Sequence, residues 1–219
     1  MSDPLWQLTE LERDAMQELM NIGFGHAAED LAEIINLHVI LSVPQIAVLQ
    51  SAEVIRFINS EIPDATDMSM ITQFFSGRFS GGSFLVFPHG EGRKLLTIFD
   101  GELALLNEDY DVEVLEQETL IEIGNIIIGA CVGKIAEMLG DVVSYAPPRF
   151  CSQEHIHGTL ADVLNTPDSF AILFKTVFNF DQHNINGYLF LVSHYSIIPW
   201  LKLAIGQFLD SLDLNSGCN

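Results

Sequence analysis

The sequence predicts an α+β fold of two pseudo-symmetric halves that share one sheet, and three observations lead to this prediction. The chain resembles itself at an offset of 104 residues, since ELMNIGFG at 18–25 matches EIGNIIIG at 122–129, and FLVF at 84–87 matches YLFL at 188–191. Each copy opens with a long segment of helical periodicity. Each then continues with short apolar segments bounded by turn residues, which are typical of strands.

One long helix is expected at the start of each half, over residues 9–36 and 114–139. Thr9 followed by Glu12 predicts a capping box, in which the two side chains bind the free N–H groups of the first turn. Within the first helix, one face is expected in the core, namely Met16, Leu19, Met20, Gly23, Ala27 and Ile34.

Strands and a shorter helix are expected after each long helix. The expected strands are 39–49, 70–79 and 83–87, then 170–180 and 188–192, with turns at 81–82 and 184–187. Hairpins imply antiparallel pairing, and helices at 91–99 and 197–209 close the halves, with Pro199 in the first turn of the latter. Residues 1–219 are therefore expected to form a single domain of two repeats, about 8–105 and 112–212.

Composition excludes several classes of protein. A hydrophobic content of 48% with 18% charged residues excludes a disordered chain. Nine Lys and Arg against 30 Asp and Glu give a net charge of -21, which repels phosphate backbones and anionic lipids. Nucleic acid and membrane surfaces are thus not expected as partners. A partner with an exposed basic group is favoured.

The cysteines and the apolar segments indicate a cytoplasmic protein. Cys131, Cys151 and Cys218 are widely spaced and lack a C-x-x-C pattern, so neither a disulfide framework nor a zinc site is indicated. The N-terminal segment is polar and acidic, unlike a signal peptide. The most apolar stretch, 121–132, is interrupted by Glu122 and Asn125, so membrane insertion is not expected.

Polar residues form a stripe along each long helix, because their spacing of four, three and four residues puts them on one face. The two stripes are Asp14, Glu18, Asn21 and Gly25, and Glu118, Glu122, Asn125 and Gly129. A single Glu and Asn three residues apart would indicate only a solvated face. Both copies, however, place the Asn directly before an Ile in an apolar segment, where Asn disfavours the helix and is costly to bury.

The chemistry of these residues is that of positioning. Glu and Asn together supply neither a nucleophile nor a sufficient metal-ligand set. An amide, however, can hold a water molecule for in-line attack, and phosphoryl transfer depends mostly on positioning and charge stabilisation. The candidate catalytic residues are therefore Glu18, Asn21, Glu122 and Asn125, with no cofactor or metal of the protein's own.

The chain resembles the CheC, CheX and FliY phosphatases of bacterial chemotaxis, whose pattern is D/S-x3-E-x2-N-x22-P. The first copy matches fully and ends at Pro44, whereas the second ends at Pro148 and opens with Glu118 instead of Asp or Ser. Two copies in one chain of this length are similar to CheC. The resemblance implies hydrolysis of the aspartyl-phosphate of a CheY-like response regulator, with each Asn orienting the attacking water and each Glu pairing with the receiver lysine. It also implies that Mg²⁺ belongs to the receiver.

Two other functions stay open on the sequence. The chain could bind a receiver domain, or a CheD-like deamidase, without catalysis. It could also be a purely structural duplicated domain, which would require both Asn side chains to be buried and hydrogen-bonded. Among the histidines, His155 and His157 are interpreted as surface loop residues, and His26 as a residue at the edge of the first stripe or a packing residue.

Overall fold

The computed structural model describes residues 8–35, 38–62, 68–88, 90–99, 111–151, 159, 170–180 and 185–216. Its described helices are α1 (Glu10–Ile35), α2 (Ser51–Glu61), α3 (Glu91–Phe99), α5 (Val112–Met138) and α7 (Ile198–Ser216), with a short 3-10 helix at Tyr195–Ile197. Its described strands are β1 (Val39–Leu41), β2 (Gln45–Gln50), β3 (Ser69–Ser76), β4 (Gly81–Phe87), β5 (Ser144–Tyr145), β6 (Arg149–Cys151), β7 (Phe170–Phe180) and β8 (Ile185–His194).

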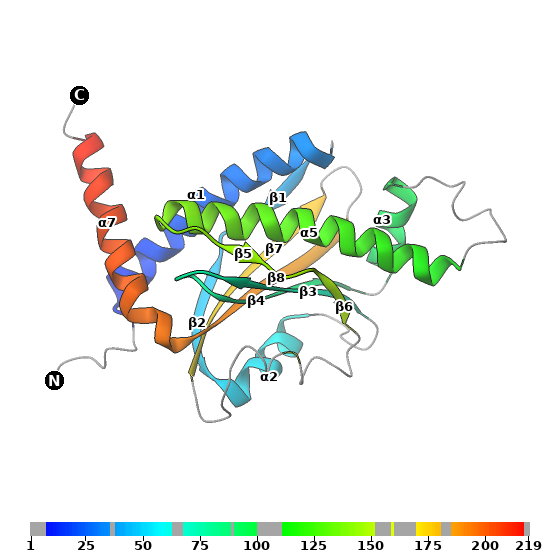
Figure 1. Ribbon diagram of the computed structural model, residues 1–219, viewed down its shortest axis with the longest axis horizontal. Coiled ribbons are helices and arrows are strands. Elements are labelled where there is room, and N and C mark those ends of the chain that lie inside the picture. The colour runs from blue at the N-terminus through cyan, green and yellow to red at the C-terminus, as the bar shows by residue number, and fades with distance from the viewer. Residues whose placement is uncertain are drawn as a thin grey trace.

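One antiparallel sheet runs through the molecule, and helices cover both of its faces. Its order is β1-β7-β8-β4-β3-β5, while β2 also pairs with β7 and β6 also pairs with β3. The long helices α1 and α5 lie over one face, and α2 lies against the other (Figure 1). The predicted α+β class and antiparallel pairing are therefore confirmed.

The two copies of the sequence repeat contribute to each other's edges of the sheet. Strands β1 and β2, from the first copy, pair with β7 of the second. Strands β5 and β6, from the second copy, pair with β3 of the first. The halves are consequently interleaved in one sheet, which leaves neither copy with a complete sheet of its own.

Local signals in the sequence account for the ends of the long helices. At the start of α1 the Thr9 amide donates to Glu12 Oε2 over 2.8 Å, and the Glu12 amide donates to Thr9 Oγ1 over 3.2 Å, which is the predicted capping box. Helix α5 starts two residues before the predicted position, because Asp111 caps it by accepting from the Glu113 amide over 3.0 Å. It stops before Gly140, whose φ of +67° suits a glycine C-cap.

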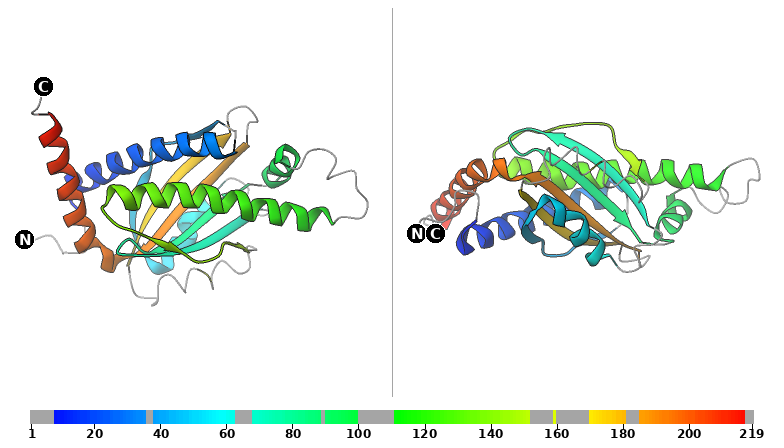
Figure 2. Two further views of the ribbon diagram at one scale, coloured as in Figure 1. Left: turned by 45° about the horizontal axis from the view of Figure 1, so that its top comes forward. Right: turned by 90° about the horizontal axis from the view of Figure 1, so that it is seen from below.

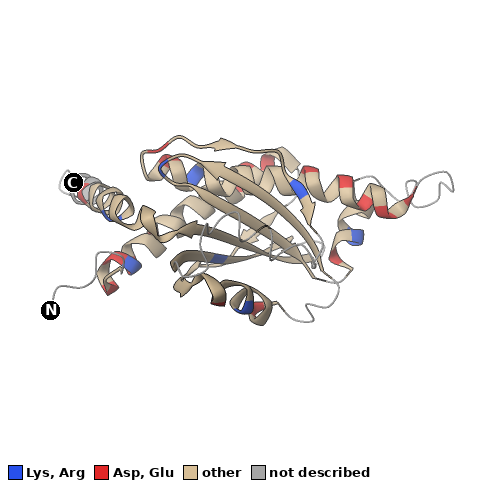
Figure 3. Cartoon of the chain, turned by 60° about the horizontal axis from the view of Figure 1, so that its bottom comes forward, with Lys and Arg blue, Asp and Glu red and all other residues tan. Residues whose placement is uncertain are grey.

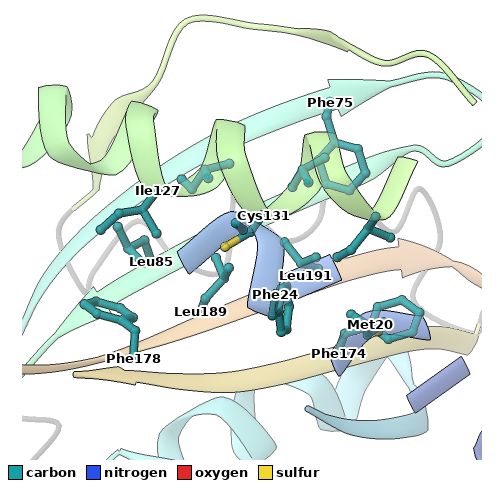
Figure 4. Close-up of a cluster of buried hydrophobic side chains, with 14 of the residues drawn as sticks. Met20, Phe24, Phe75, Leu85, Ile127, Cys131, Phe174, Phe178, Leu189 and Leu191 are labelled. Atoms are coloured by element: carbon teal, nitrogen blue, oxygen red, sulfur yellow. The ribbon is translucent and has the colours of Figure 1, made fainter. Parts of the chain in front are cut away.

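Two hydrophobic clusters hold the layers together, one on each face of the sheet. The larger lies between the sheet and the helices α1, α3, α5 and α7, and Figure 4 shows part of it, with Phe24 of α1 and Cys131 of α5 pointing toward Leu189 and Leu191 of β8. The smaller lies between the sheet and α2, with Val54 and Ile58 fully buried. Helix α5 comes very close to β3, since a Cβ at Gly124 would lie 2.8 Å from Ile71 Cγ2.

Several predicted boundaries are wrong, each for a local reason. The expected strand 39–49 is split into β1 and β2 by residues 42–44, which include Pro44, and Pro148 directly precedes β6, so neither proline lies inside a ladder. Gly81 and Gly82 are not a turn but the start of β4. The preceding strand stops at Ser76 because the Phe79 amide donates to Asp141 Oδ2 over 2.8 Å instead of to a neighbouring strand.

Other predictions differ at the helices and at the second hairpin. Residues 185–187 belong to β8, and the rest of the expected turn at 184–187 lies outside the described residues. Helix α2 was not predicted, although Val54 and Ile58 have the i, i+4 spacing of a buried helical face. Helix α7 continues to Ser216, beyond the expected end at 209. Ile34, expected in the core, is 63% exposed.

Helix α5 has a length and a composition that would also suit a membrane span. An 18-residue window of it has a mean hydropathy of 1.6. However, 56% of that window is buried inside the protein. The helix packs on α1 and on β3, so its apolar character is explained by its position over the sheet (Figure 2).

Candidate functional site

The stripe on α1 lies on the side of the helix that faces away from the core. Asp14, Glu18 and Gly25 are exposed and Asn21 is half-buried. The predicted core positions Met16, Leu19, Met20, Gly23 and Ala27 are all buried. Glu18 and Asn21 therefore lie one helical turn apart on an accessible face, as the spacing predicts.

The stripe on α5 has the same placement. Glu118, Glu122 and Asn125 are exposed and Gly129 is half-buried. The opposite side of this helix is buried against the sheet and α1, through Leu120, Ile123, Gly124, Ile127 and Ile128. Most of the apolar residues next to Asn125 in the sequence thus face the core, while Asn125 itself is exposed.

The helices α1 and α5 lie side by side and run in opposite directions (Figure 1). Lys134 of α5 forms an ion pair with Asp30 of α1 over 3.3 Å, and a Cβ at Gly23 would lie 3.3 Å from Met138 Sδ. These contacts lie away from the two stripes. Within the described part of the chain, no hydrogen bond or ion pair joins a stripe residue of α1 to one of α5, so the structure presents two separate Glu/Asn pairs.

The Asn125 amide is held by a residue from the sheet. Gln73 Nε2 of β3 donates to Asn125 Oδ1 over 2.9 Å and to the Ala146 carbonyl oxygen over 3.0 Å. For the Asn21 side chain, no hydrogen bond occurs with any residue that the structure describes. Gln73 was not among the predicted site residues, although a Gln between Ile71 and Phe75 on the helix-facing side of a strand is a signal that could have indicated it.

Tyr145 of β5 borders the same site. Its hydroxyl donates to the Gly129 carbonyl oxygen over 3.2 Å. Burial, and to a smaller extent the nearby Cys131 thiol, raises the pKa of Tyr145, so the phenol stays a neutral hydrogen-bond donor at neutral pH. The space above both stripe glycines is open, because a Cβ at Gly25 or Gly129 would have nothing within 4 Å.

The stripe carboxylates are available for an external cation. Among the described residues, none of Asp14, Glu18, Glu118 and Glu122 takes part in an ion pair. The lysines, in contrast, are engaged: Lys94 with Glu91, Lys134 with Asp30, Lys175 with Glu61 and Lys202 with Glu12. Figure 3 shows acidic positions spaced along α5, with few basic ones near them.

A hollow of about 520 Å³ adjoins the second pair. Glu118 and Glu122 form part of its wall, and the rest is mainly apolar, with Ile34, Ile35, Phe99, Leu115, Thr119, Ile123 and Ile126. The exposed Ile34 noted above belongs to this wall. The α5 stripe therefore combines free carboxylates with an apolar surface next to them.

Metal binding finds no support in the described part of the chain, where no group of three or more His, Cys, Asp or Glu could hold an ion. His155 and His157 lie outside the described residues. His26 is exposed beside Gly25 at the end of the first stripe. A purely structural role for both Asn residues does not fit either, since Asn125 is exposed and Asn21 only half-buried.

Comparisons with known proteins find relatives of this chain in sequence and in structure. A sequence profile of the CheC-like family matches residues 11–48, which include Glu18, Asn21 and Pro44. The CheY-P phosphatase CheC of Bacillus subtilis (strain 168) is 22% identical over 212 residues, covering 92% of this chain and 97% of that protein. The second motif lies outside the profile match but inside this longer alignment.

Solved structures share the fold. FliY of Thermotoga maritima has a TM-score of 0.62 at 16% identity, covering 92% of this chain and 98% of that one. The FliM middle domain of Vibrio alginolyticus has a TM-score of 0.57 at 13% identity, covering 86% and 99%. The chain is therefore similar to the CheC-like family over its first motif helix and to CheC over almost its whole length, and it shares its fold with these solved structures.

Proposed function

We propose that this protein is a phosphatase that hydrolyses the aspartyl-phosphate of a CheY-like response regulator. The observation that carries the proposal is the pair of exposed Glu/Asn faces, Glu18 with Asn21 and Glu122 with Asn125, whose carboxylates take part in no ion pair within the described residues. The fold alone does not select this function, because the non-enzymatic FliM middle domain shares it. The two Glu/Asn pairs supply what the fold lacks, namely a carboxylate for a receiver lysine and an amide for the attacking water.

In the proposed mechanism, the receiver supplies the phosphorylated aspartate, the lysine and the Mg²⁺. Glu18 or Glu122 pairs with the lysine and fixes the helix across the receiver site. The Asn amide on the next turn holds a water molecule in line with the P–O bond to the aspartate. The water oxygen bonds to phosphorus, that P–O bond breaks, the aspartate leaves as a carboxylate, and the water proton passes to the released phosphate or to solvent.

We propose further that the two sites descend from one unit and are related by an approximate two-fold axis through the sheet. The strand order supports this, since β1-β7-β8-β4-β3-β5 reads the same from either end when strands of the two copies are exchanged. The proposed substrate would place the protein in the cytoplasm, where a CheD-like protein is a possible further partner.

The decisive test is the rate at which a phosphorylated receiver domain loses phosphate in the presence of this protein. The native chain, Asn21→Ala, Asn125→Ala and the double variant would be compared at equal concentration. The matched control is Asn59→Ala, an exposed helical Asn on α2, on the opposite face of the sheet. Acceleration by the native chain and by the control, reduced in each single variant and absent in the double, supports the proposal.

A non-enzymatic adaptor is the second candidate, and the opening residue of the second motif favours it. Glu118 stands where the family pattern has Asp or Ser, which would suit a half that kept binding but lost rate. In the same experiment, an adaptor would bind the phosphorylated receiver without accelerating phosphate loss. Titration calorimetry measures binding to the receiver, and the rate of phosphate loss measures turnover. An adaptor shows binding alone, whereas a phosphatase shows both.

A further inference from the structure

We propose that Gln73 is a positioning residue for Asn125, and that it makes the α5 site pre-organised while the α1 site is not. This inference rests on the proposed function. It begins from one contact, the hydrogen bond of 2.9 Å from Gln73 Nε2 to Asn125 Oδ1, which joins β3 of the first sequence copy to α5 of the second. A site in one half is therefore held by a residue of the other half.

The direction of this hydrogen bond follows from a third group. Gln73 Nε2 also lies 3.0 Å from the Ala146 carbonyl oxygen, which can only accept. The end of the Gln73 amide that faces Ala146 must therefore be the NH₂ group. Because the same NH₂ group faces Asn125, Asn125 must present its oxygen to Gln73 and its own NH₂ group to solvent. The sheet thus decides which way round the Asn125 amide stands.

The Gln73 side chain is buried inside the protein. It is 3% exposed, and its carbonyl oxygen Oε1 is buried without a hydrogen-bond partner among the described residues. A buried polar side chain with one unsatisfied end is unfavourable compared with an apolar residue of similar size. A Met or Leu at this position could not replace the two hydrogen bonds that the Gln73 NH₂ group donates to Asn125 and to Ala146.

The counterpart of Gln73 in the other half is Phe178. In the sheet Gln73 lies opposite Ser83, and Phe178 lies opposite Gly187, which follows Ser83 by 104 residues. The Phe178 ring sits over Gly187 in the core, where a Cβ would lie 1.9 Å from the ring, and Figure 4 shows it among apolar side chains. Since Phe178 has no polar side-chain atom, it cannot give Asn21 the hydrogen bond that Asn125 receives.

The two sites should therefore differ in rate more than in affinity. A fixed Asn125 presents its NH₂ group and the remaining oxygen lone pair in one arrangement, so less orientational freedom is lost when the water is bound. Asn21 receives no hydrogen bond from the described residues, so in this proposal it is oriented by the partner or by the water itself. The receiver lysine is held by Glu18 or Glu122, which Gln73 does not touch, so the affinity for the receiver should not depend on Gln73.

The activity test uses Gln73→Met, which keeps the length of the side chain and removes its donors. In an Asn21→Ala background, where only the α5 site remains, we expect kcat for receiver dephosphorylation to fall about tenfold with KM unchanged. In an Asn125→Ala background, where only the α1 site remains, we expect no change. Equal losses in both backgrounds would mean general damage to the fold and would overturn the proposal, as would no loss in the first.

A second measurement does not depend on activity. The side-chain NH₂ signals of Asn125, assigned by their absence in Asn125→Ala, would be followed by NMR in the native chain and in Gln73→Met. We expect the order parameter of this amide to fall in Gln73→Met, while that of Asn21 stays the same. If Asn21→Ala proves to have no phosphatase activity, the proposed function of the α5 site is refuted. The NMR measurement then remains as the test of whether Gln73 positions Asn125. An Asn125 amide as rigid in the variant as in the native chain would overturn the proposal.

Discussion

Leu85 of β4 lies directly opposite Leu189 of β8 in the antiparallel register, and Leu189 follows Leu85 by 104 residues. The same offset separates Asn21 from Asn125. Equivalent positions of the two sequence copies are thus paired across the two middle strands of the sheet, β4 and β8. At the edges of the sheet, β1 of the first copy pairs with β7 of the second, and β5 of the second copy pairs with β3 of the first. This arrangement explains how Gln73, on β3 of the first copy, can reach Asn125 of the second.

We expect Gly124→Ala to destabilise the protein by about 1–3 kcal/mol, although alanine favours helix more than glycine does. The reason is steric, because the new Cβ would lie 2.8 Å from Ile71 Cγ2 on β3. Urea denaturation gives the free energy of unfolding. The matched control is Gly25→Ala, where nothing lies within 4 Å of the new Cβ, and where we expect a gain of up to about 1 kcal/mol. A change of the same sign in both variants would contradict this account of the α5–β3 contact.

The same Gly25→Ala variant tests why a glycine ends each stripe. The open space over Gly25 and Gly129 would allow a partner to approach the helix backbone closely. If a receiver domain docks there, Gly25→Ala in an Asn125→Ala background should raise KM several-fold while stabilising the fold. Steady-state kinetics with a phosphorylated receiver measures this, and an unchanged KM would show that the glycine is not part of the contact.

Neutralising the site carboxylates should weaken association with the receiver. We expect Glu18→Gln with Glu122→Gln to raise KM and to reduce its dependence on salt, because charge pairs across an interface are screened by ions. The control is Glu10→Gln with Glu113→Gln, which makes the same charge change at exposed positions in the first turns of α1 and α5. KM measured from about 50 to about 500 mM salt, a range that includes the physiological ionic strength of roughly 150 mM, checks the prediction. Equal effects of all these substitutions would point to net charge alone.

The ion pair of Lys175 with Glu61, on the face of the sheet that α2 covers, should be important for stability. The Lys175 ammonium donates to Glu61 and lies 5.6 Å from the centre of the Tyr188 ring, and Lys175 is 8% exposed. We expect Glu61→Gln to cost about 1–3 kcal/mol, because the mostly buried ammonium loses its charged partner. Combining it with Lys175→Met should restore part of this loss. The reference is the pair of the exposed Lys94 with the half-buried Glu91, and Lys94→Met should cost less than about 1 kcal/mol.

The Cys131 thiol should make the protein less stable at high pH. Burial raises the pKa of Cys131 from 9.0 to about 12. Since the folded state holds this proton more tightly than the unfolded state, the stabilisation is complete below pH 9 and is lost as the pH rises from 9 to about 12. The slope from this group is at most about 1.4 kcal/mol per pH unit, and Cys131→Ala should remove it from the unfolding curves.

Alkylation gives an independent check on the same thiol. At pH 8 we expect iodoacetamide to leave Cys131 unmodified in the folded protein and to modify it after unfolding, because the thiolate is the reactive form. Mass spectrometry of the peptide containing Cys131 reads this directly. Rapid modification in the folded state would contradict the burial of this side chain.

Much of the site was predictable because it depends on local spacing. The capping box of Thr9 and Glu12 needs only residues three apart, and the stripe of Glu18 and Asn21 needs only the helical period. The buried side of α1 was predicted correctly except at Ile34, which comes one residue before the end of the helix and faces the hollow beside α5. Helical periodicity cannot predict the burial of such a residue, because its exposure depends on which other element packs next to it.

Long-range contacts decided the rest. The residues around 77–80 leave the strand because an Asp141 carboxylate, 62 residues away from Phe79, binds a backbone amide there. The approach of α5 to β3 depends on Gly124 and Ile71, which are distant in the chain. No periodicity reports contacts of this kind, since they arise only when the elements pack.

By itself the sequence determined the α+β class, the repeat, both motif helices and the four residues that carry the proposed chemistry, because periodicity and capping act over a few residues. Only the tertiary structure decided how strands of the two copies interleave and which of the two Asn side chains is held. The physical reason lies in the sheet, where one register places the Gln73 amide under α5 and the Phe178 ring at the counterpart position. A hydrogen bond between residues 52 positions apart exists only once that register has formed.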